Sequence, residues 1–183
     1  MNEDTSKFSE SERPIGRAAL ETDLSGQISS WRDFSDLVSE VVAMAVQEPG
    51  PIVLSDRNFE HWPLGQRAVV DAFQQWAMSS AREIRCSLLA GNFDGFILKH
   101  PRWLNWRKLW AHRVLCRQAP EELFFSVPTI LALPGKIGLR VVEPLVGRGL
   151  WTRDPTVIGD WLSEVDVILQ QSSEGMPTTT LGL

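Results

Sequence analysis

The chain of 183 residues has no tyrosine, only two cysteines and only three histidines, and it lacks long apolar runs. Its longest apolar stretches, residues 41–46 and 129–134, fall far short of the roughly 20 residues that a membrane-spanning helix needs, so we expect no membrane partner. Residues 1–11 are polar and acidic, whereas an export signal is basic and then apolar. The sequence therefore predicts a cytoplasmic protein, and its length predicts one main domain.

Sites for metals, nucleotides and nucleophilic catalysis are also missing. Cys86 and Cys116 lie in apolar segments, where a reducing compartment favours buried thiols over a disulfide or a redox role. Cysteines and histidines are too dispersed for the paired spacings of a structural zinc site. Neither Gly135-Lys136 nor Gly147-Arg-Gly149 has the remaining residues of a phosphate or dinucleotide loop, and no serine has the G-x-S-x-G setting. We expect neither a metal nor a cofactor.

The chain is instead rich in aromatic residues, with eight tryptophans and eight phenylalanines, and its net charge of −5 is unevenly distributed. Residues 1–50 carry four basic and ten acidic side chains. Residues 51–117 carry ten basic and five acidic side chains, and residues 118–183 carry four basic and eight acidic ones. The acidic N-terminal part could fold back on the basic middle or screen it until a partner displaces it. Solvated faces of mixed sign are the simpler interpretation.

The N-terminal half predicts a disordered acidic arm followed by a folded domain. Residues 1–30 have isolated apolar side chains without a sustained period, which is typical of disorder. Ser30, with Asp33 three positions later, predicts the start of a helix that the Pro-Gly-Pro of residues 49–51 ends. Helical segments then alternate with short apolar runs, with strands expected at 51–56, 83–90 and 114–117 and helices at 66–79 and 101–112.

This alternation predicts an α/β domain over residues 31–172, with a mixed, largely parallel sheet covered by helices on both faces. Apolar runs at 128–133 and 136–142 predict a β-hairpin, because Pro134 and Gly135 between them suit the centre of a type II turn. Asp154 and Pro155 predict the N-cap and first turn of a final helix over 155–171. We expect residues 173–183 to form an extended C-terminal tail.

The most distinctive segment is the helix that places three tryptophans on one narrow stripe with arginines at its borders. These residues are Arg102, Trp103, Trp106, Arg107, Trp110 and Arg113. Aromatic side chains flanked by cations are typical of a surface that stacks the bases of single-stranded nucleic acid. The same stripe would also pack a helix on a sheet, with arginine stems covering its edges, and this interpretation is the simpler one. Trp62 and Trp151, in loop-like segments, are freer candidates for recognition.

A second candidate site follows from the expected topology. In a parallel sheet, ligands bind beyond the carboxyl ends of the strands, which here means Asp56, Arg57, Asn92 and Asp94. Asp56 and Asp94 could form a general acid/base pair across neighbouring loops. Such residues more often cap turns and helix starts through bonds to nearby amides.

The pattern of residues 34–172 resembles that of a phospholipase D-like domain, of the short, single-copy bacterial kind. The resemblance rests on the helix before Pro-Ile-Val-Leu-Ser-Asp at 51–56, the segment Pro-Leu-Gly-Gln-Arg-Ala-Val-Val-Asp-Ala-Phe at 63–73, the arginine-rich strand and helix, and the hairpin. Active members of this family carry H-x-K-x4-D, in which the histidine is the nucleophile and the lysine holds phosphate. Val127, Thr129 and Pro134 stand at the three defining positions.

The resemblance therefore implies a domain without this chemistry, since valine cannot attack phosphorus and threonine cannot supply positive charge. The sequence favours a non-catalytic module that binds a protein partner or a second copy of itself. The alternative is a protein that binds single-stranded nucleic acid through residues 82–117, and the next is an enzyme with a relocated acid/base site at the strand ends.

Overall fold

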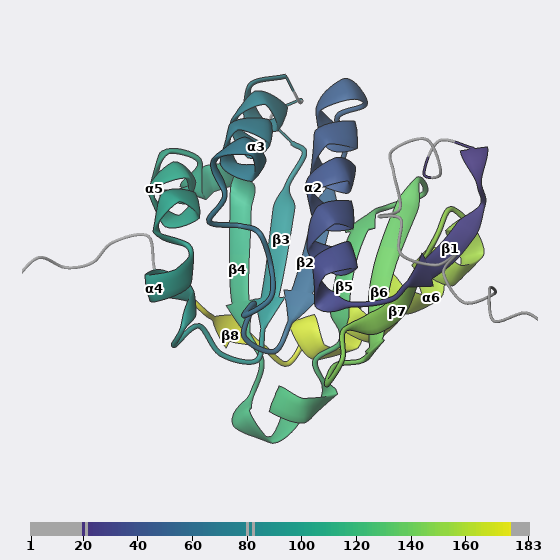
Figure 1. Cartoon of the computed structure of the whole chain (residues 1–183). Coiled ribbons are helices and arrows are strands. Elements are labelled where there is room, and N and C mark those ends of the chain that lie inside the picture. Colours follow the sequence, from purple (N-terminus) through teal and green to yellow (C-terminus); the bar gives the residue numbers. More distant parts are fainter. Residues whose placement is uncertain (1–19, 21, 80, 82, 177–183) are drawn as a thin grey trace, which may run out of the picture.

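A computed structural model describes residues 20, 22–79, 81 and 83–176 (Figure 1). The helices are α2 (Trp31–Gln47), α3 (Arg67–Ser79), α4 (Phe96–Lys99), α5 (Pro101–Leu109) and α6 (Pro155–Leu169), with the 3-10 turns η1 (Ala111–Arg113) and η2 (Glu121–Ser126). The strands are β1 (Ser25–Ile28), β2 (Ile52–Asp56), β3 (Cys86–Ala90), β4 (Val114–Gln118), β5 (Thr129–Leu133), β6 (Ile137–Glu143), β7 (Arg148–Thr152) and β8 (Ser173–Glu174).

The strands form one mixed sheet in the order β1-β7-β6-β5-β2-β3-β4-β8. Only the neighbours β2–β3 and β3–β4 are parallel, and the other five pairings are antiparallel. The predicted mixed α/β fold is confirmed, but the prediction of a largely parallel sheet is wrong. The connection from β4 to β5 contains only η2 and lacks the crossover helix that usually joins parallel strands, so β5 runs back against β2.

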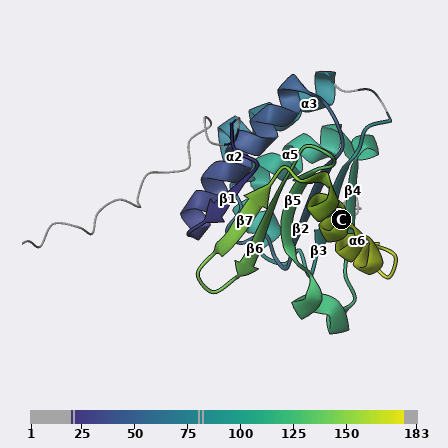
Figure 2. The ribbon, with the colours of Figure 1, turned by 90° about the vertical axis from the view of Figure 1, so that its right-hand side faces the viewer.

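Helices cover both faces of the sheet, as the alternation of elements predicts (Figure 2). One layer contains α2, α3 and α5, whose buried residues share a core with Leu54, Cys86 and Leu88 of the sheet. On the other face, α6 packs Ile158, Trp161 and Val165 against a second cluster that includes Ile130 and Leu89. This α6 face is separate from the face that carries the tryptophan helix.

Both edges of the sheet differ from the sequence prediction. The predicted disordered arm, residues 1–30, includes β1, which pairs antiparallel with β7 from Ser25 opposite Thr152 to Ile28 opposite Gly149. The sequence analysis predicted no strand between residues 142 and 155, where β7 lies, and so offered β1 no partner. Residues 1–19 and 21 lie outside the described residues. At the other edge, β8 at the start of the predicted extended tail pairs with β4, and residues 177–183 are not described.

Local signals at the helix starts and in the hairpin are confirmed. The Ser30 side chain accepts a hydrogen bond from the Asp33 amide at 3.2 Å, and Asp154 accepts one from the Thr156 amide at 2.8 Å. In the β5–β6 hairpin, the Lys136 amide donates to the Leu133 carbonyl, and Gly135 has a φ of 73°. A type II turn requires a positive φ at this position, which glycine adopts without strain.

The aromatic excess of the sequence forms core. Trp62, Trp76, Trp103, Trp106, Trp151 and Trp161 are buried, and Trp31 and Trp110 are half-buried. The expectation that Trp62 and Trp151 are free for recognition is therefore wrong, since Trp151 lies within β7 and Trp62 contacts Phe34 and Phe59. Cys86 and Cys116 are buried free thiols, and burial raises the pKa of Cys116 to about 11.

Candidate nucleic-acid interface

The predicted stacking stripe on α5 lies mainly in the core. Trp103 contacts Phe73, Phe96 and Trp106, with ring centroids 6.2, 5.4 and 5.5 Å away. Trp110 is half-buried, and its indole donates to the Gln74 side chain at 2.8 Å. Because bases cannot stack on buried rings, the structure contradicts a platform built from these tryptophans.

Two of the three arginines beside this stripe are also buried. Arg107 donates to the Met176 carbonyl and so holds the segment that follows β8. Arg113 donates to the carbonyls of Ala77 at 2.6 Å and Ala81 at 2.7 Å, which lie at or just beyond the end of α3. These guanidinium groups satisfy backbone carbonyls within the fold and do not contribute cations to a surface.

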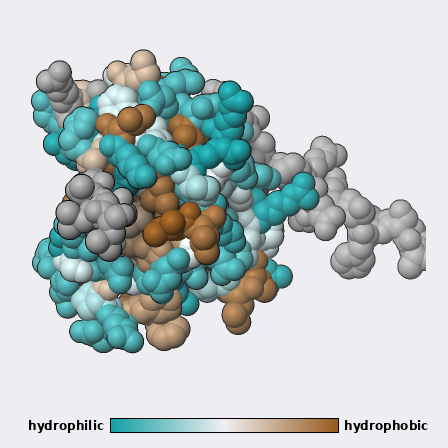
Figure 3. Space-filling model, turned by 90° about the vertical axis from the view of Figure 1, so that its left-hand side faces the viewer, coloured by the Kyte–Doolittle hydropathy of each residue, from teal (hydrophilic) through white to brown (hydrophobic). Residues whose placement is uncertain are grey.

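The outer side of α4 and α5 retains exposed cations. The α4–α5 surface comprises Ile97, Leu98, Lys99, Arg102, Asn105, Lys108 and Leu109, all of them exposed. Residues 96–109 contain no aspartate or glutamate. Arg102 donates to the Gly65 carbonyl at 3.1 Å, which brings Arg67 at the start of α3 near the same surface. Figure 3 faces this side of the molecule and shows hydrophobic side chains gathered amid hydrophilic ones.

The opposite face of the sheet has the other sign of charge. In α6, Asp160, Glu164 and Asp166 are exposed and no basic residue occurs, and η2 adds Glu121 and Glu122. Within this face, Arg140 of β6 pairs with Glu164 at 2.6 Å. The exposed residues of α4 and α5 thus carry positive charge, whereas those of α6 carry negative charge. A polyanion would be attracted to the former.

A pocket of about 360 Å³ lies beside the α4–α5 surface, between α2, the segment before α3 and the α4–α5 junction. Its lining includes Ser35, Glu60, His61, Gln66, Lys99 and His100, so that an acidic side chain lies in the same pocket as Lys99. His100 is buried, and its Nε2 lies 2.9 Å from the Phe59 carbonyl oxygen, to which it donates. The imidazole therefore fixes the junction of the two helices against the segment that precedes α3.

This buried histidine should make stability depend on pH. Burial lowers the pKa of His100 from its ordinary value of 6.5, the bond to Phe59 opposes this effect, and Lys99 lowers the pKa further. Below pH 6.5 the unfolded chain binds a proton that the folded chain does not, so the free energy of unfolding falls as the pH drops. Between pH 7 and pH 5.5, urea denaturation should show a greater loss of unfolding free energy in the wild type than in His100→Gln. Parallel pH dependences of the two proteins would contradict this role.

The predicted strand-end site is a structural junction. The Asp56 carboxylate accepts hydrogen bonds from the amides of Asn58 at 3.2 Å and Phe59 at 2.7 Å, and from the Thr129 hydroxyl. Asp94 is exposed, and its amide lies 3.4 Å from the Asn92 side-chain oxygen. These contacts are the turn-capping roles that aspartate and asparagine commonly have. They give no support to an acid/base pair of Asp56 and Asp94.

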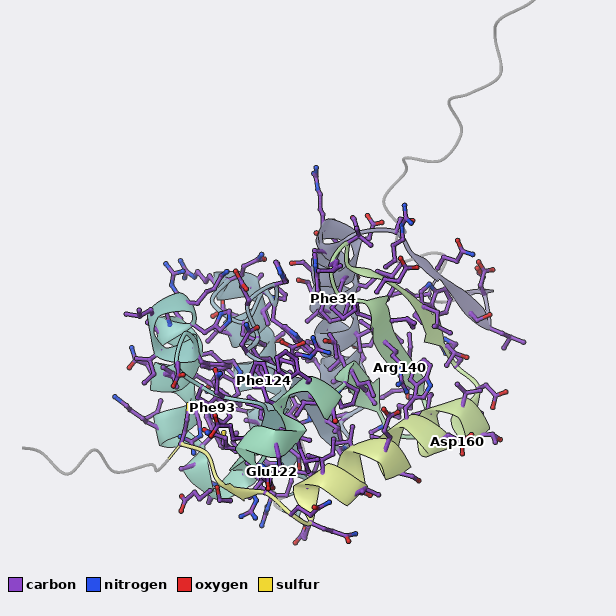
Figure 4. The ribbon with its side chains drawn as sticks, turned by 90° about the horizontal axis from the view of Figure 1, so that it is seen from below. Phe34, Phe93, Glu122, Phe124, Arg140 and Asp160 are labelled. Atoms are coloured by element: carbon purple, nitrogen blue, oxygen red, sulfur yellow. The ribbon has the colours of Figure 1, made fainter. Side chains whose placement is uncertain are left out.

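The η2 segment lies over the same strand ends (Figure 4). Arg57 donates to the Phe125 carbonyl at 2.9 Å and lies 5.6 Å from the centre of its ring. The Phe124 ring packs so closely on Gly91 that a side chain at position 91 would meet it at 2.6 Å. The crevice that a parallel sheet would offer to a ligand is therefore occupied by the chain itself.

Of the three positions compared with H-x-K-x4-D, Val127 and Thr129 lie next to this junction, whereas Pro134 lies beyond the other end of β5. Val127 is buried, the Thr129 hydroxyl donates to Asp56, and Pro134 belongs to the β5–β6 turn.

Within the described part of the chain, no group of three histidine, cysteine, aspartate or glutamate side chains could hold a metal ion. Over the same residues, no helix has the length and apolar character to cross a membrane.

Comparison with known proteins shows a relationship of fold only. No protein-family model and no curated protein matches the sequence. Among solved structures, the chain is similar to TrmBL2, an archaeal chromatin protein whose structure is described as showing a novel mode of DNA binding. The match has a TM-score of 0.58 at 12% sequence identity, and it covers 83% of this chain and 54% of that one. The chain thus spans about half the length of this α/β neighbour.

The sequence interpretation selected the side of this segment that the structure buries. It predicted one helix over 101–112, whereas the structure begins a short helix at Phe96 and ends α5 at Leu109. Of its six candidate residues, only Arg102 is exposed. Lys99 and Lys108 were not selected, although the absence of acidic residues from 96 to 109 is a signal that could have identified them.

Proposed function

We propose that this chain is a non-catalytic DNA-binding module that contacts duplex phosphates through its α4–α5 surface. The observation that carries the proposal is the exposure of Lys99, Arg102 and Lys108 on two consecutive helices whose own residues, 96–109, include no acidic side chain. Support also comes from the fold, which is similar to that of the DNA-binding chromatin protein TrmBL2. Phosphate contacts by exposed lysine and arginine supply most of the non-specific affinity for DNA.

Duplex DNA suits this surface better than single strands. Binding of single strands depends on aromatic platforms, and Trp103 and Trp106 are in the core. Lysine and arginine contacts to phosphate need no unstacked base. The proposed ligand therefore differs from that of the sequence-based alternative, which placed single strands on the tryptophans.

We further propose that the domain is related to phospholipase D-like domains, that it lacks their catalytic activity, and that the protein is cytoplasmic. The support is the sequence pattern over residues 34–172 and the residues Val127, Thr129 and Pro134 in place of the catalytic ones. The purified protein should not hydrolyse phosphodiester substrates. Hydrolysis that one point substitution abolishes would contradict the proposal that the domain is non-catalytic.

Neutralising the surface tests the DNA-binding proposal. The variant Lys99→Gln/Arg102→Gln/Lys108→Gln should bind a 20-base-pair duplex at least about tenfold more weakly than the wild type at low salt, measured by fluorescence anisotropy. The control, Arg32→Gln/Lys136→Gln/Arg148→Gln, changes the charge equally at sites outside α4 and α5 and should retain most of the affinity. Equal affinities of the two triple variants would reject the α4–α5 surface as the interface.

A protein-interaction role is the second candidate. The observation that favours it is the exposure of Leu109 and Leu98 on the same surface. A protein partner or a second copy would cover these side chains. Sedimentation of the wild type and Leu109→Ser, each without DNA, tests self-association, which predicts a dimer in the wild type that the substitution disrupts.

A further inference from the structure

The α4 helix presents apolar side chains that phosphate binding does not explain. Leu98 is 86% exposed and Ile97 is 60% exposed, although both lie within a four-residue helix beside the basic residues. Single exposed apolar side chains are ordinary, and what distinguishes this corner is an adjacent exposed pair that lies beside cations.

This corner is held in place by the core beneath it. Phe96, the residue before the exposed pair, is fully buried, with its ring 5.5 Å from Phe59 and 5.4 Å from Trp103. The Lys99 amide donates to the Gly95 carbonyl at 3.1 Å, and the His100 amide to the Phe96 carbonyl at 2.9 Å. Ile97 and Leu98 therefore project from a supported turn.

Charge indicates what covers the corner. Lys99 follows Leu98 directly, Arg102 lies in the first turn of α5, and no acidic side chain occurs between residues 96 and 109. Cations beside apolar side chains suit an occupant that is anionic and that also offers an apolar space to a leucine. Duplex DNA meets both requirements, because phosphates line its grooves and base steps can open to an inserted apolar side chain.

We propose that Leu98, together with Ile97, inserts as a wedge between base pairs of duplex DNA. Lys99 and Arg102 bind the adjacent phosphates, and the insertion bends the duplex. This inference rests on the proposed function and specifies its mode of contact. Insertion of this kind partly unstacks one step and kinks the DNA, and the additional protein contacts offset the cost.

The test measures DNA bending separately from affinity. A 20-base-pair duplex with a fluorophore at each end should show increased energy transfer on binding the wild-type protein, and this increase should be lost in Ile97→Ala/Leu98→Ala. The affinity of that variant should fall only a few-fold, since its cations are intact. Val167→Ala, which shortens an exposed apolar side chain on the acidic α6 face, should bend DNA like the wild type.

The outcomes separate the two proposals. The wedge proposal fails if the wild type binds DNA without a change in energy transfer, or if Ile97→Ala/Leu98→Ala still produces the change. Either result would leave the DNA-binding proposal intact. Absence of wild-type binding to the duplex would overturn the proposed function and the wedge with it. Binding to anionic phosphatidylglycerol vesicles that the double variant loses, with no bending of DNA, would overturn the wedge in favour of a lipid surface.

Discussion

Trp103→Ala is expected to lower the free energy of unfolding by about 3–5 kcal/mol, which is the usual cost of removing a large aromatic side chain from a packed core. Trp103 is fully buried, and its ring lies against Phe73, Phe96 and Trp106. Urea denaturation followed by circular dichroism measures the effect. Leu109→Ala on the exposed side of the same helix is the matched control and should change stability by no more than about 0.5 kcal/mol.

This comparison also tests which side of α5 faces solvent. A loss below about 1 kcal/mol for Trp103→Ala would fall well short of the cost of emptying a core site. If that small loss came with weaker binding of single-stranded DNA, the tryptophan would be a stacking residue and the orientation of α5 described above would be wrong.

Replacing Arg113 with methionine is expected to cost about 3 kcal/mol, because two or more backbone carbonyls lose charged donors in a buried setting. Arg113 is 2% exposed, and its guanidinium bonds Ala77 and Ala81 and lies 5.1 Å from the centre of the Trp76 ring. Methionine preserves most of the side-chain length, so the loss isolates the hydrogen bonds. For a domain of this size, the thermal midpoint should fall by roughly 6–12 °C.

Arg102→Met provides the control for Arg113→Met. Arg102 is exposed and bonds a single carbonyl, that of Gly65, so its replacement should have little effect on stability. Equal thermal midpoints of Arg113→Met and Arg102→Met would show that Arg113 does not cap α3. A weaker DNA affinity of Arg113→Met at full stability would place this arginine on the interface.

Local features of the fold could be predicted from the sequence because short-range chemistry determines them. Ser30 and Asp154 cap helices, and Pro134 and Gly135 form the hairpin turn, as their residue types require. The directions of the central strands could not be predicted from local signals. A strand's direction depends on whether the preceding connection crosses the sheet, and residues 119–128 read equally well as a crossover or as a return.

Edge pairing and side-chain burial were harder to predict. Ser25-Gly-Gln-Ile28 has the composition of a loop, and it becomes a strand only because β7 offers a free edge. Arg107 and Arg113 look like surface cations in the sequence, whereas buried carbonyls distant in the chain satisfy them. A charged side chain can be assigned to the core only when its partners are known.

The salt dependence of duplex binding tests the central proposal most directly. Four cations lie on or near the α4–α5 surface: Lys99, Arg102 and Lys108, together with Arg67, which pairs with Asp71 at 3.6 Å. If each neutralises one phosphate, the logarithm of the association constant should fall linearly with the logarithm of salt concentration, with a slope of about −3 to −4 for the wild type. The slope should approach about −1 in Lys99→Gln/Arg102→Gln/Lys108→Gln. An affinity that does not change with salt, or no binding at low salt, would contradict a DNA-binding role for this surface.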